Sequence, residues 1–359
     1  MSGLLPPLTS IPSDVVCAAD YEHRAREHMA PDRWAYLSGG AGDEITLADN
    51  TSAFAALKLM PRVLSAAGPF RTEVKVAGLT LPHPFLLAPI GWQALFHPHA
   101  EIAVAQAASV TETPFAVSTY ATTPVETIAA HCAAPLFFQI YFQPSRDTTL
   151  QLVRNAEAAG CKALLVTVDA PVSGIRNREQ RAGYALPSGM VAANLPPSPP
   201  SSGAPVTLHA RPGWKDLEWL AAQTGLPLFV KGVLAPDDAL RSLDCGASGI
   251  VVSNHGGRVL DTAPAAIAAL PAVAAAVNGK APILLDSGIR RGADAFKAIA
   301  LGAQAVFVGR PYIWALSVAG ALGVAHLMRT LREEFEITLA LMGCQSPTEI
   351  APEHIFRAL

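Results

Sequence analysis

From residue 85 onwards, short apolar runs alternate with longer amphipathic segments. Each run has the length of a buried strand, and each segment that follows is long enough for a helix. Repeated strand-helix units predict parallel strands joined by helical crossovers. The apolar runs span residues 85–90, 114–119, 136–141, 163–169, 228–232, 249–254, 283–287 and 305–309. Eight units favour an α/β fold of the (β/α)8, or TIM, barrel type over a doubly wound sheet, which would usually open with a glycine-rich phosphate turn.

Two regions depart from this rhythm. Residues 1–80 read as a helical cap, with amphipathic helices predicted over 20–30 and 47–56. Residues 186–211 are too rich in proline for a helix and too long for an ordinary loop after a strand, so they predict a lid at the barrel mouth. We therefore expect a single domain: cap 1–80, barrel 81–345 with lid 186–211, and tail 346–359.

The composition and charge of the chain limit the classes of function that are expected. A chain of 359 residues that is 51% hydrophobic can bury a large core. Its net charge is −3 and it has no cluster of basic residues, so it offers no electrostatic footprint for nucleic acid or an anionic membrane. The alanine-rich stretch 263–277 is short and contains Pro264 and Pro271, which predicts a packed helix pair rather than a membrane span. Small-molecule chemistry is the expected activity.

The cysteines and the N-terminal segment bear on the cellular location of the protein. Five are scattered without the short spacings of a zinc site or a disulfide framework, so no metal site is predicted. The N-terminal segment has no basic and apolar pattern of a signal peptide. We expect a cytoplasmic protein.

The predicted strands end in polar or glycine residues. In a parallel barrel these ends meet on one face, where ligands bind. The residues gathered there are Gly91, Ser118, Tyr120, Gln139, Tyr141, Thr167, Asp169, Lys231, Ser253, His255, Arg258, Asp286, Arg290, Gly309 and Arg310.

The loop after the sixth predicted strand carries a proton acceptor and a fixed cation. The proton acceptor is His255, because an imidazole is a common proton acceptor in proteins, and Arg258 presents a planar fork that matches a carboxylate. Gly256 and Gly257 allow a sharp turn and close approach to a ligand. Taken alone, this loop is also compatible with a purely structural turn.

The last two strands point to a phosphorylated ligand. Their loops combine glycines with Arg290 and Arg310, in the region where many barrels bind phosphate. Lys231, at the end of the fifth strand, is compatible with a Schiff base, pyridoxal phosphate or a flavin. His255 favours the flavin, because a base that removes a substrate proton while a flavin accepts electrons needs no lysine adduct.

The chain resembles the FMN-dependent L-2-hydroxy-acid oxidases and dehydrogenases, which include glycolate oxidase, lactate oxidase, lactate 2-monooxygenase and mandelate dehydrogenase. Almost the whole chain contributes, and Ser-Asn-His-Gly-Gly-Arg at 253–258 is the most specific motif. The other matching segments are Asp20-Tyr21-Glu22, Pro61-Arg62-Val63-Leu64, Phe137-Phe138-Gln139-Ile140-Tyr141, Thr167-Val168-Asp169, Lys231-Gly232 and the loops from Asp286 to Arg310.

This resemblance implies a role for each site residue. His255 is implied as the proton acceptor with Asp169 stabilising its charged form, Tyr141 as the partner of the 2-hydroxyl, and Lys231 as the cation beside flavin N1 and O2. The substrate contacts implied are Tyr21, Arg258, Arg176 and Tyr120. The FMN contacts implied are Pro89, Ile90, Gly91, Ser118, Gln139, Thr167, Lys231, Ser253, Asp286, Gly288, Arg290, Gly309 and Arg310.

Three departures bear on the acceptor and the substrate. Gly91 stands where many oxidases have alanine, which changes the room for oxygen or product and leans towards lactate monooxygenase. Tyr120 stands where glycolate oxidases have tryptophan, as in lactate-oxidase-type pockets, and the lid contains no tyrosine.

The expected function is oxidation of an L-2-hydroxy acid to the 2-oxo acid with O2 as acceptor, in a homotetramer by family resemblance. The alternatives are a dehydrogenase that reduces a quinone or cytochrome and, more remotely, an FMN-dependent isomerase of the isopentenyl diphosphate type.

Overall fold

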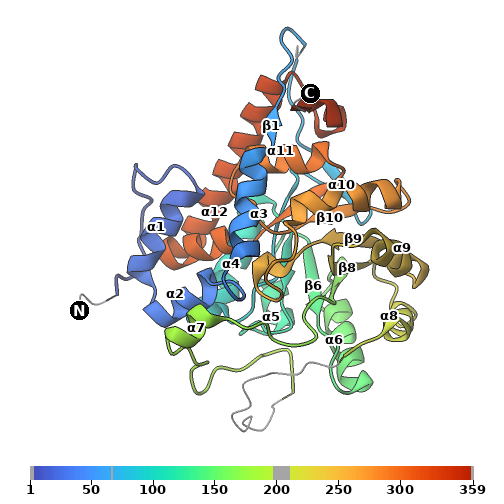
Figure 1. Cartoon of the computed structure of the whole chain (residues 1–359). Coiled ribbons are helices and arrows are strands. Elements are labelled where there is room, and N and C mark those ends of the chain that lie inside the picture. Colours follow the sequence, from blue (N-terminus) through green and yellow to red (C-terminus); the bar gives the residue numbers. More distant parts are fainter. Residues whose placement is uncertain (1–3, 66–67, 197–210, 357–359) are drawn as a thin grey trace.

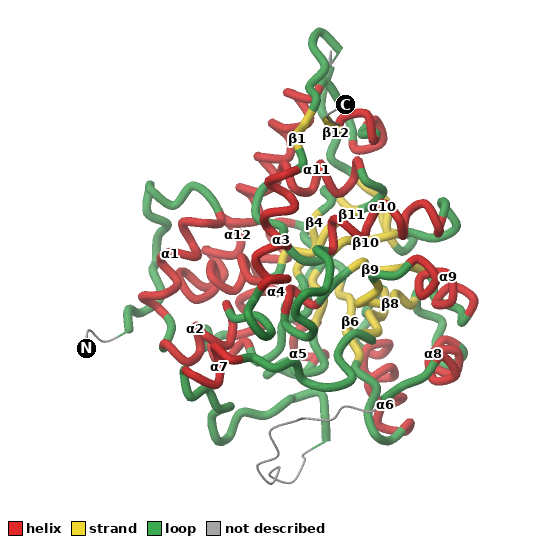
Figure 2. The backbone as a smooth tube through the Cα atoms, in the orientation of Figure 1, coloured by secondary structure: helices red, strands yellow, loops and turns green. Residues whose placement is uncertain are grey.

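The computed structural model describes residues 4–65, 68–196 and 211–356. Its centre is a closed barrel of eight parallel strands, which confirms the predicted TIM-barrel fold. The strands are β4 (Phe85–Leu87), β5 (Phe115–Val117), β6 (Leu136–Ile140), β7 (Ala163–Thr167), β8 (Leu228–Val233), β9 (Gly249–Val252), β10 (Ile283–Leu285) and β11 (Ala305–Val308). Pairing of β11 with β4, with Val306 opposite Phe85, closes the ring, drawn as the yellow strands of Figure 2.

Helices cover the outside of this barrel. They are α4 (Ala100–Thr111), α5 (Val125–Ala130), α6 (Arg146–Ala158), α8 (Trp214–Ala221), α9 (Pro236–Asp244), α10 (Ala266–Val277), α11 (Gly292–Ala300) and α12 (Arg310–Met342). Because the barrel interior and the helices bury both faces of each strand, β6, β7 and β9 are buried along their whole length. This explains why the strands appear in the sequence as continuous apolar runs rather than as alternating patterns.

Helix α10 differs from its sequence-based prediction, and α12 is unusually long and apolar. The predicted helix pair over 263–277 is wrong, because α10 is one helix that contains Pro271. Helix α12 is the one helix among the described residues that is long and apolar enough to cross a membrane, yet 78% of its apolar window is buried inside the protein. It packs against α1, α4 and α11, and Ala319 and Gly320 interrupt its helical backbone.

The cap consists of α1 (Ala18–His28), α2 (Pro31–Ser38) and α3 (Ile45–Ala56). Helices α1 and α3 match the two predicted segments to within two residues at each end, but α2 was not predicted. It is only eight residues long and begins at Pro31, a residue that favours the first turn of a helix. In Figure 1, α1 and α2 lie beside α12 on the left, and α3 lies in front of the barrel.

Short elements complete the chain. An antiparallel hairpin joins β2 (Val74–Val76) to β3 (Leu79–Leu81), and α7 (Asn177–Arg181) precedes the predicted lid. In the tail, β12 (Ile355–Phe356) pairs with β1 (Lys58–Leu59) at the end of the cap. Residues 186–196 of the predicted lid contain no helix or strand, and its remaining residues up to 210 lie outside the described residues.

The packing of α12 on the barrel generates a stability prediction. Phe335 is fully buried and meets the ring of Phe85 edge-on, with centroids 6.0 Å apart. Phe335→Ala should lower the free energy of unfolding by about 3–5 kcal/mol, because it leaves a cavity in the core. Chemical denaturation measures the change. Ile337→Ala on the same helix is the control, since Ile337 is 59% exposed, and an equal loss in both variants would contradict the assignment of Phe335 to the core.

Candidate active site

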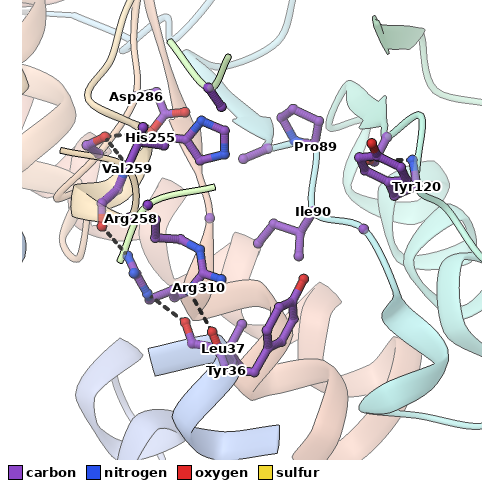
Figure 3. Close-up of a pocket in the computed structure, with 18 of the residues that line it drawn as sticks. Tyr36, Leu37, Pro89, Ile90, Tyr120, His255, Arg258, Val259, Asp286 and Arg310 are labelled. Carbon is purple, nitrogen blue, oxygen red and sulfur yellow. Dashed lines mark hydrogen bonds between the residues drawn. The ribbon is translucent and has the colours of Figure 1, made fainter. Parts of the chain in front are cut away.

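A cavity of about 400 Å³ opens at the carboxyl ends of the barrel strands. Most of the predicted site residues line it: Pro89, Ile90, Gly91, Ser118, Tyr120, Tyr141, Arg176, Lys231, His255, Arg258, Asp286, Gly288, Arg290, Gly309 and Arg310. The predicted residues Gln139, Asp169 and Ser253 do not line the cavity but hydrogen-bond to lining residues, and Thr167 pairs with Lys231 on the neighbouring strand. Figure 3 shows side chains from the cap, from the end of β4 and from the loop after β9 meeting around one space.

His255 is held as a proton acceptor. Its Nδ1 lies 2.9 Å from Oδ1 of Asp169, and its Nε2 lies 3.4 Å from the Tyr141 hydroxyl. The carboxylate favours the form of the ring that carries hydrogen on Nδ1, which leaves Nε2 free to accept a proton from a ligand. Asp169 is also suited to stabilise the imidazolium that this transfer produces.

The backbone of this loop has an unusual conformation. His255, Gly256 and Gly257 all have positive φ angles, of 58°, 65° and 72°. A Cβ on Gly257 would lie 2.7 Å from the backbone nitrogen of Leu47, so this position requires glycine. The two glycines thus allow the loop to pass under α3 while it presents His255 to the cavity.

Lys231 and Asp286 form a buried ion pair at the cavity wall. Nζ of Lys231 lies 2.7 Å from Oδ2 of Asp286 and donates to Oγ of Ser253 at 3.0 Å. Burial opposes both charges, but their mutual attraction outweighs it, so the pKa of Lys231 is raised and that of Asp286 is lowered. The site therefore keeps a permanent cation next to the cavity.

A second group of charges lies beside the histidine. Arg258 and Arg176 share one carboxylate, with Oε1 of Glu179 3.2 Å from Nη2 of Arg258 and 3.2 Å from Nε of Arg176. Burial raises the pKa of Glu179 despite these two cations. Sequence reasoning missed Glu179, although its position three residues after Arg176 is a spacing at which helical side chains meet.

The predicted role of Tyr21 at the substrate is not supported by its position. Tyr21 is 1% exposed, packs between α1 and α12, and its hydroxyl lies 3.0 Å from Nδ1 of His326. Tyr36 of α2 lines the cavity instead, with its ring under the Arg258 guanidinium at 5.0 Å. Sequence reasoning missed Tyr36, and the available signal was its place just before the glycine turn at 39–42.

The far end of the cavity is suited to an anion. Arg310 donates to the carbonyl oxygens of Leu37, Gly39 and Gly256, and no carboxylate among the described residues pairs with it or with Arg290. Burial, together with the charge of Arg258 and Arg290, lowers the pKa of Arg310 to about 9. Two half-buried guanidinium groups, neither of which forms an ion pair with a described carboxylate, fit the phosphate of a flavin nucleotide, and Lys231 fits the negative charge of a reduced flavin ring.

The ring-binding candidates lie on neighbouring strands. Oε1 of Gln139 accepts from the Ser118 hydroxyl at 3.3 Å, and Nε2 of Gln139 donates to the Thr167 hydroxyl at 3.1 Å. This buried polar ladder across β5, β6 and β7 fixes the orientation of the Gln139 amide. Its Ser118 end reaches the cavity lining, where it can contact the edge of a planar ligand.

Gly91 does not create the extra room for oxygen or product that the family resemblance implies. A Cβ built on Gly91 would lie 2.8 Å from Cβ of Tyr120 and 3.0 Å from the Tyr120 carbonyl oxygen. The space of the missing methyl group is therefore occupied by Tyr120. The ring of Tyr120 in turn stacks on Trp92, with centroids 5.6 Å apart.

Comparisons with known proteins agree with this geometry. The model of the FMN-dependent dehydrogenase family matches residues 25–357. An L-lactate oxidase of Alicycliphilus denitrificans is 45% identical over 96% of this chain and 98% of its own length. Glycolate oxidase 3 of Arabidopsis thaliana is 39% identical over 95% of this chain and 96% of its own length. A crystal structure of mandelate oxidase with (S)-2-phenylpropionate superposes with a TM-score of 0.89 at 40% identity, covering 96% of this chain and 98% of the other.

The buried ion pair generates a prediction about pH. The pKa of Asp286 in the folded state lies below its ordinary value of 3.8, so its contribution to stability is present above about pH 4 and is lost as the pH falls through the lowered pKa. Asp286→Asn should cost about 3–5 kcal/mol at neutral pH, because it leaves Lys231 buried without a counterion.

Denaturation at neutral and acidic pH measures this effect. The stability difference between the parent and Asp286→Asn should shrink in acid, whereas Asp49→Asn on the exposed side of α3 should show no such change. A difference that stays constant down to acidic pH would argue against the ion pair as its source.

Proposed function

The chain belongs to the FMN-dependent dehydrogenase family, and from this premise we propose that it is an oxidase that converts a small or medium L-2-hydroxy acid into the 2-oxo acid, with FMN as cofactor and O2 as acceptor. The observation that carries the proposal is the placement of His255 and Asp169 beside Arg258 and Arg176 in one cavity. A base next to a carboxylate-binding pair is what oxidation of a 2-hydroxy acid requires.

The proton path follows from the distances. Nε2 of His255 is the accepting atom, while Nδ1–H donates to the Asp169 carboxylate, which compensates the positive charge that the ring gains. Burial and the charge of Asp169 raise the pKa of Tyr141 well above its ordinary value, so its hydroxyl stays protonated and acts as a donor. Tyr141 and His255 can therefore hold the substrate hydroxyl from two sides.

The substrate carboxylate has two cations and an aromatic wall. Arg258 and Arg176 attract it, and Glu179 keeps both guanidinium groups in place. Tyr36 carries Arg258 on its ring face and stacks on Tyr184 at 4.5 Å, which makes this wall rigid. We assign to Tyr36 the substrate-binding role that the resemblance implies for Tyr21.

FMN, when bound, supplies the acceptor for the two electrons that leave the substrate. Arg290, Arg310 and Gly309 would hold its phosphate, and Asp286 its ribityl chain. Lys231, Ser118, Gln139, Thr167 and Ser253 would hold the ring. The cytoplasmic location and the homotetramer remain predictions.

The proposal is tested by anaerobic flavin bleaching with L-2-hydroxy acids of increasing size, from glycolate and lactate to mandelate. We expect a yellow protein that at least one of these acids reduces. His255→Ala should retain the flavin and slow its reduction by about 10²–10⁴-fold, the usual contribution of a general base. His23→Ala, at an exposed site on α1, is the matched control. A colourless protein, or a flavin that none of the acids bleaches, would refute the proposed function.

The space beside Gly91 bears on whether the reduced enzyme releases peroxide or decarboxylates a retained product. Since Tyr120 fills the space beside Gly91, we propose a simple oxidase that releases peroxide rather than a monooxygenase that decarboxylates a retained product. Peroxide and 2-oxo acid should form in equal amounts when catalase is absent. A deficit of peroxide together with a carboxylic acid one carbon shorter would support the monooxygenase, and rapid reduction of a quinone with little oxygen uptake would support the dehydrogenase.

A further inference from the structure

Ser287 adopts a backbone conformation that rarely suits a residue with a side chain. It follows β10, it is 8% exposed, and its φ is 82°, in the region where glycine is strongly favoured. A serine here is strained, and strain of this kind persists only where the surrounding contacts hold it. The contacts of the Ser287 side chain are therefore expected to hold this backbone conformation in place.

The hydroxyl of Ser287 joins two parts of the active site. It donates to Oδ1 of Asp286 at 2.8 Å and accepts from the backbone nitrogen of Gly256 at 3.0 Å. Gly256 immediately follows His255 on the left-handed turn. One buried hydroxyl thus connects the Lys231–Asp286 ion pair to the loop that presents the base.

A second serine makes the corresponding connection on the other side. Oγ of Ser253 accepts from Nζ of Lys231 at 3.0 Å and from the backbone nitrogen of His255 at 3.0 Å. Two consecutive backbone N–H groups, of His255 and Gly256, therefore donate to two serine hydroxyls that both contact the ion pair. Together with the contact of 2.7 Å between Lys231 and Asp286, these bonds form a closed ring.

We propose that Ser287 is a positioning residue that sets the orientation of His255 and the charge balance of the Lys231–Asp286 pair together. The role of His255 in this inference rests on the proposed function. Without the hydroxyl, the Gly256 N–H and Oδ1 of Asp286 both lose a buried partner. The left-handed turn then loses one of the two serine hydroxyls that hold its backbone N–H groups. The Asp286 carboxylate, no longer shared with that hydroxyl, offsets more of the positive charge of Lys231 at the cavity wall.

Two substitutions separate the hydroxyl from the strain. Ser287→Ala removes the hydroxyl and keeps the unfavourable φ, whereas Ser287→Gly removes both. Asn278→Gly is the matched control, because Asn278 also has a positive φ, of 47°, but is exposed at the end of α10. All variants are prepared as FMN-loaded full-length protein.

We expect both Ser287 variants to lower the rate constant of anaerobic flavin reduction about tenfold, the size of one hydrogen bond to a charged group. The dissociation constant of the substrate should stay within about twofold, since Arg258 and Arg176 are untouched and the loss of one hydrogen bond acts on the reacting geometry. The flavin midpoint potential, measured against reference dyes, should become more negative in both. Ser287→Gly should melt at a higher temperature than Ser287→Ala, and Asn278→Gly should leave rate and potential unchanged.

The measurements distinguish a positioning role of Ser287 from a purely structural one. An unshifted midpoint potential in both Ser287 variants, or a parent-like reduction rate in either, would overturn the positioning role. Equal losses in rate and substrate affinity would reduce Ser287 to a structural residue. The dye measurement needs no substrate, so a parent that no 2-hydroxy acid reduces would refute the proposed function, whereas the potentials of the variants would still decide on Ser287.

Discussion

The left-handed turn at residues 255–257 is the constraint on which the site depends. His255 meets Asp169 only because three consecutive residues adopt positive φ angles. Such a turn is unfavourable by itself, and the fold stabilises it from several directions. Below it lie the serines and the ion pair, while Asn254 and Asn50 exchange side-chain hydrogen bonds of 2.9 and 2.7 Å between this loop and α3. The carbonyl of Gly257 also accepts from the backbone nitrogen of Ala41 at 2.8 Å.

The cap is consequently part of the active site rather than an addition to the barrel. Its glycine turn supplies the carbonyl oxygen of Gly39 to both Arg258 and Arg310, and its second helix supplies the aromatic wall. Asp261, beyond the turn, accepts from the backbone nitrogens of Asp43 and Thr46 and so fastens the loop to the start of α3. The barrel places the strand ends, and the cap fixes the angle at which the loop after β9 leaves them.

The barrel and most of the residues around the cavity could be predicted from the sequence, because apolar runs mark the strands and the position after each strand marks the site. Tyr36 and Glu179 could not, since each belongs to a short helix whose place over the barrel depends on long-range packing. Tyr21 was misassigned for the same reason: the motif around it marks α1, whose inner face packs on α12. The space at Gly91 could not be predicted either, because Cβ and the carbonyl oxygen of Tyr120, on the loop after β5, occupy it.

The sharing of Glu179 by two arginines has a consequence for selectivity. Two guanidinium groups and one carboxylate give the Arg258–Glu179–Arg176 cluster a single net positive charge. A monocarboxylate neutralises that charge, whereas a neutral ester or amide leaves it unbalanced and a dicarboxylate brings one negative charge too many into a low-dielectric space. The net charge of this cluster therefore favours ligands that carry one negative charge, whatever the shape of their side chains.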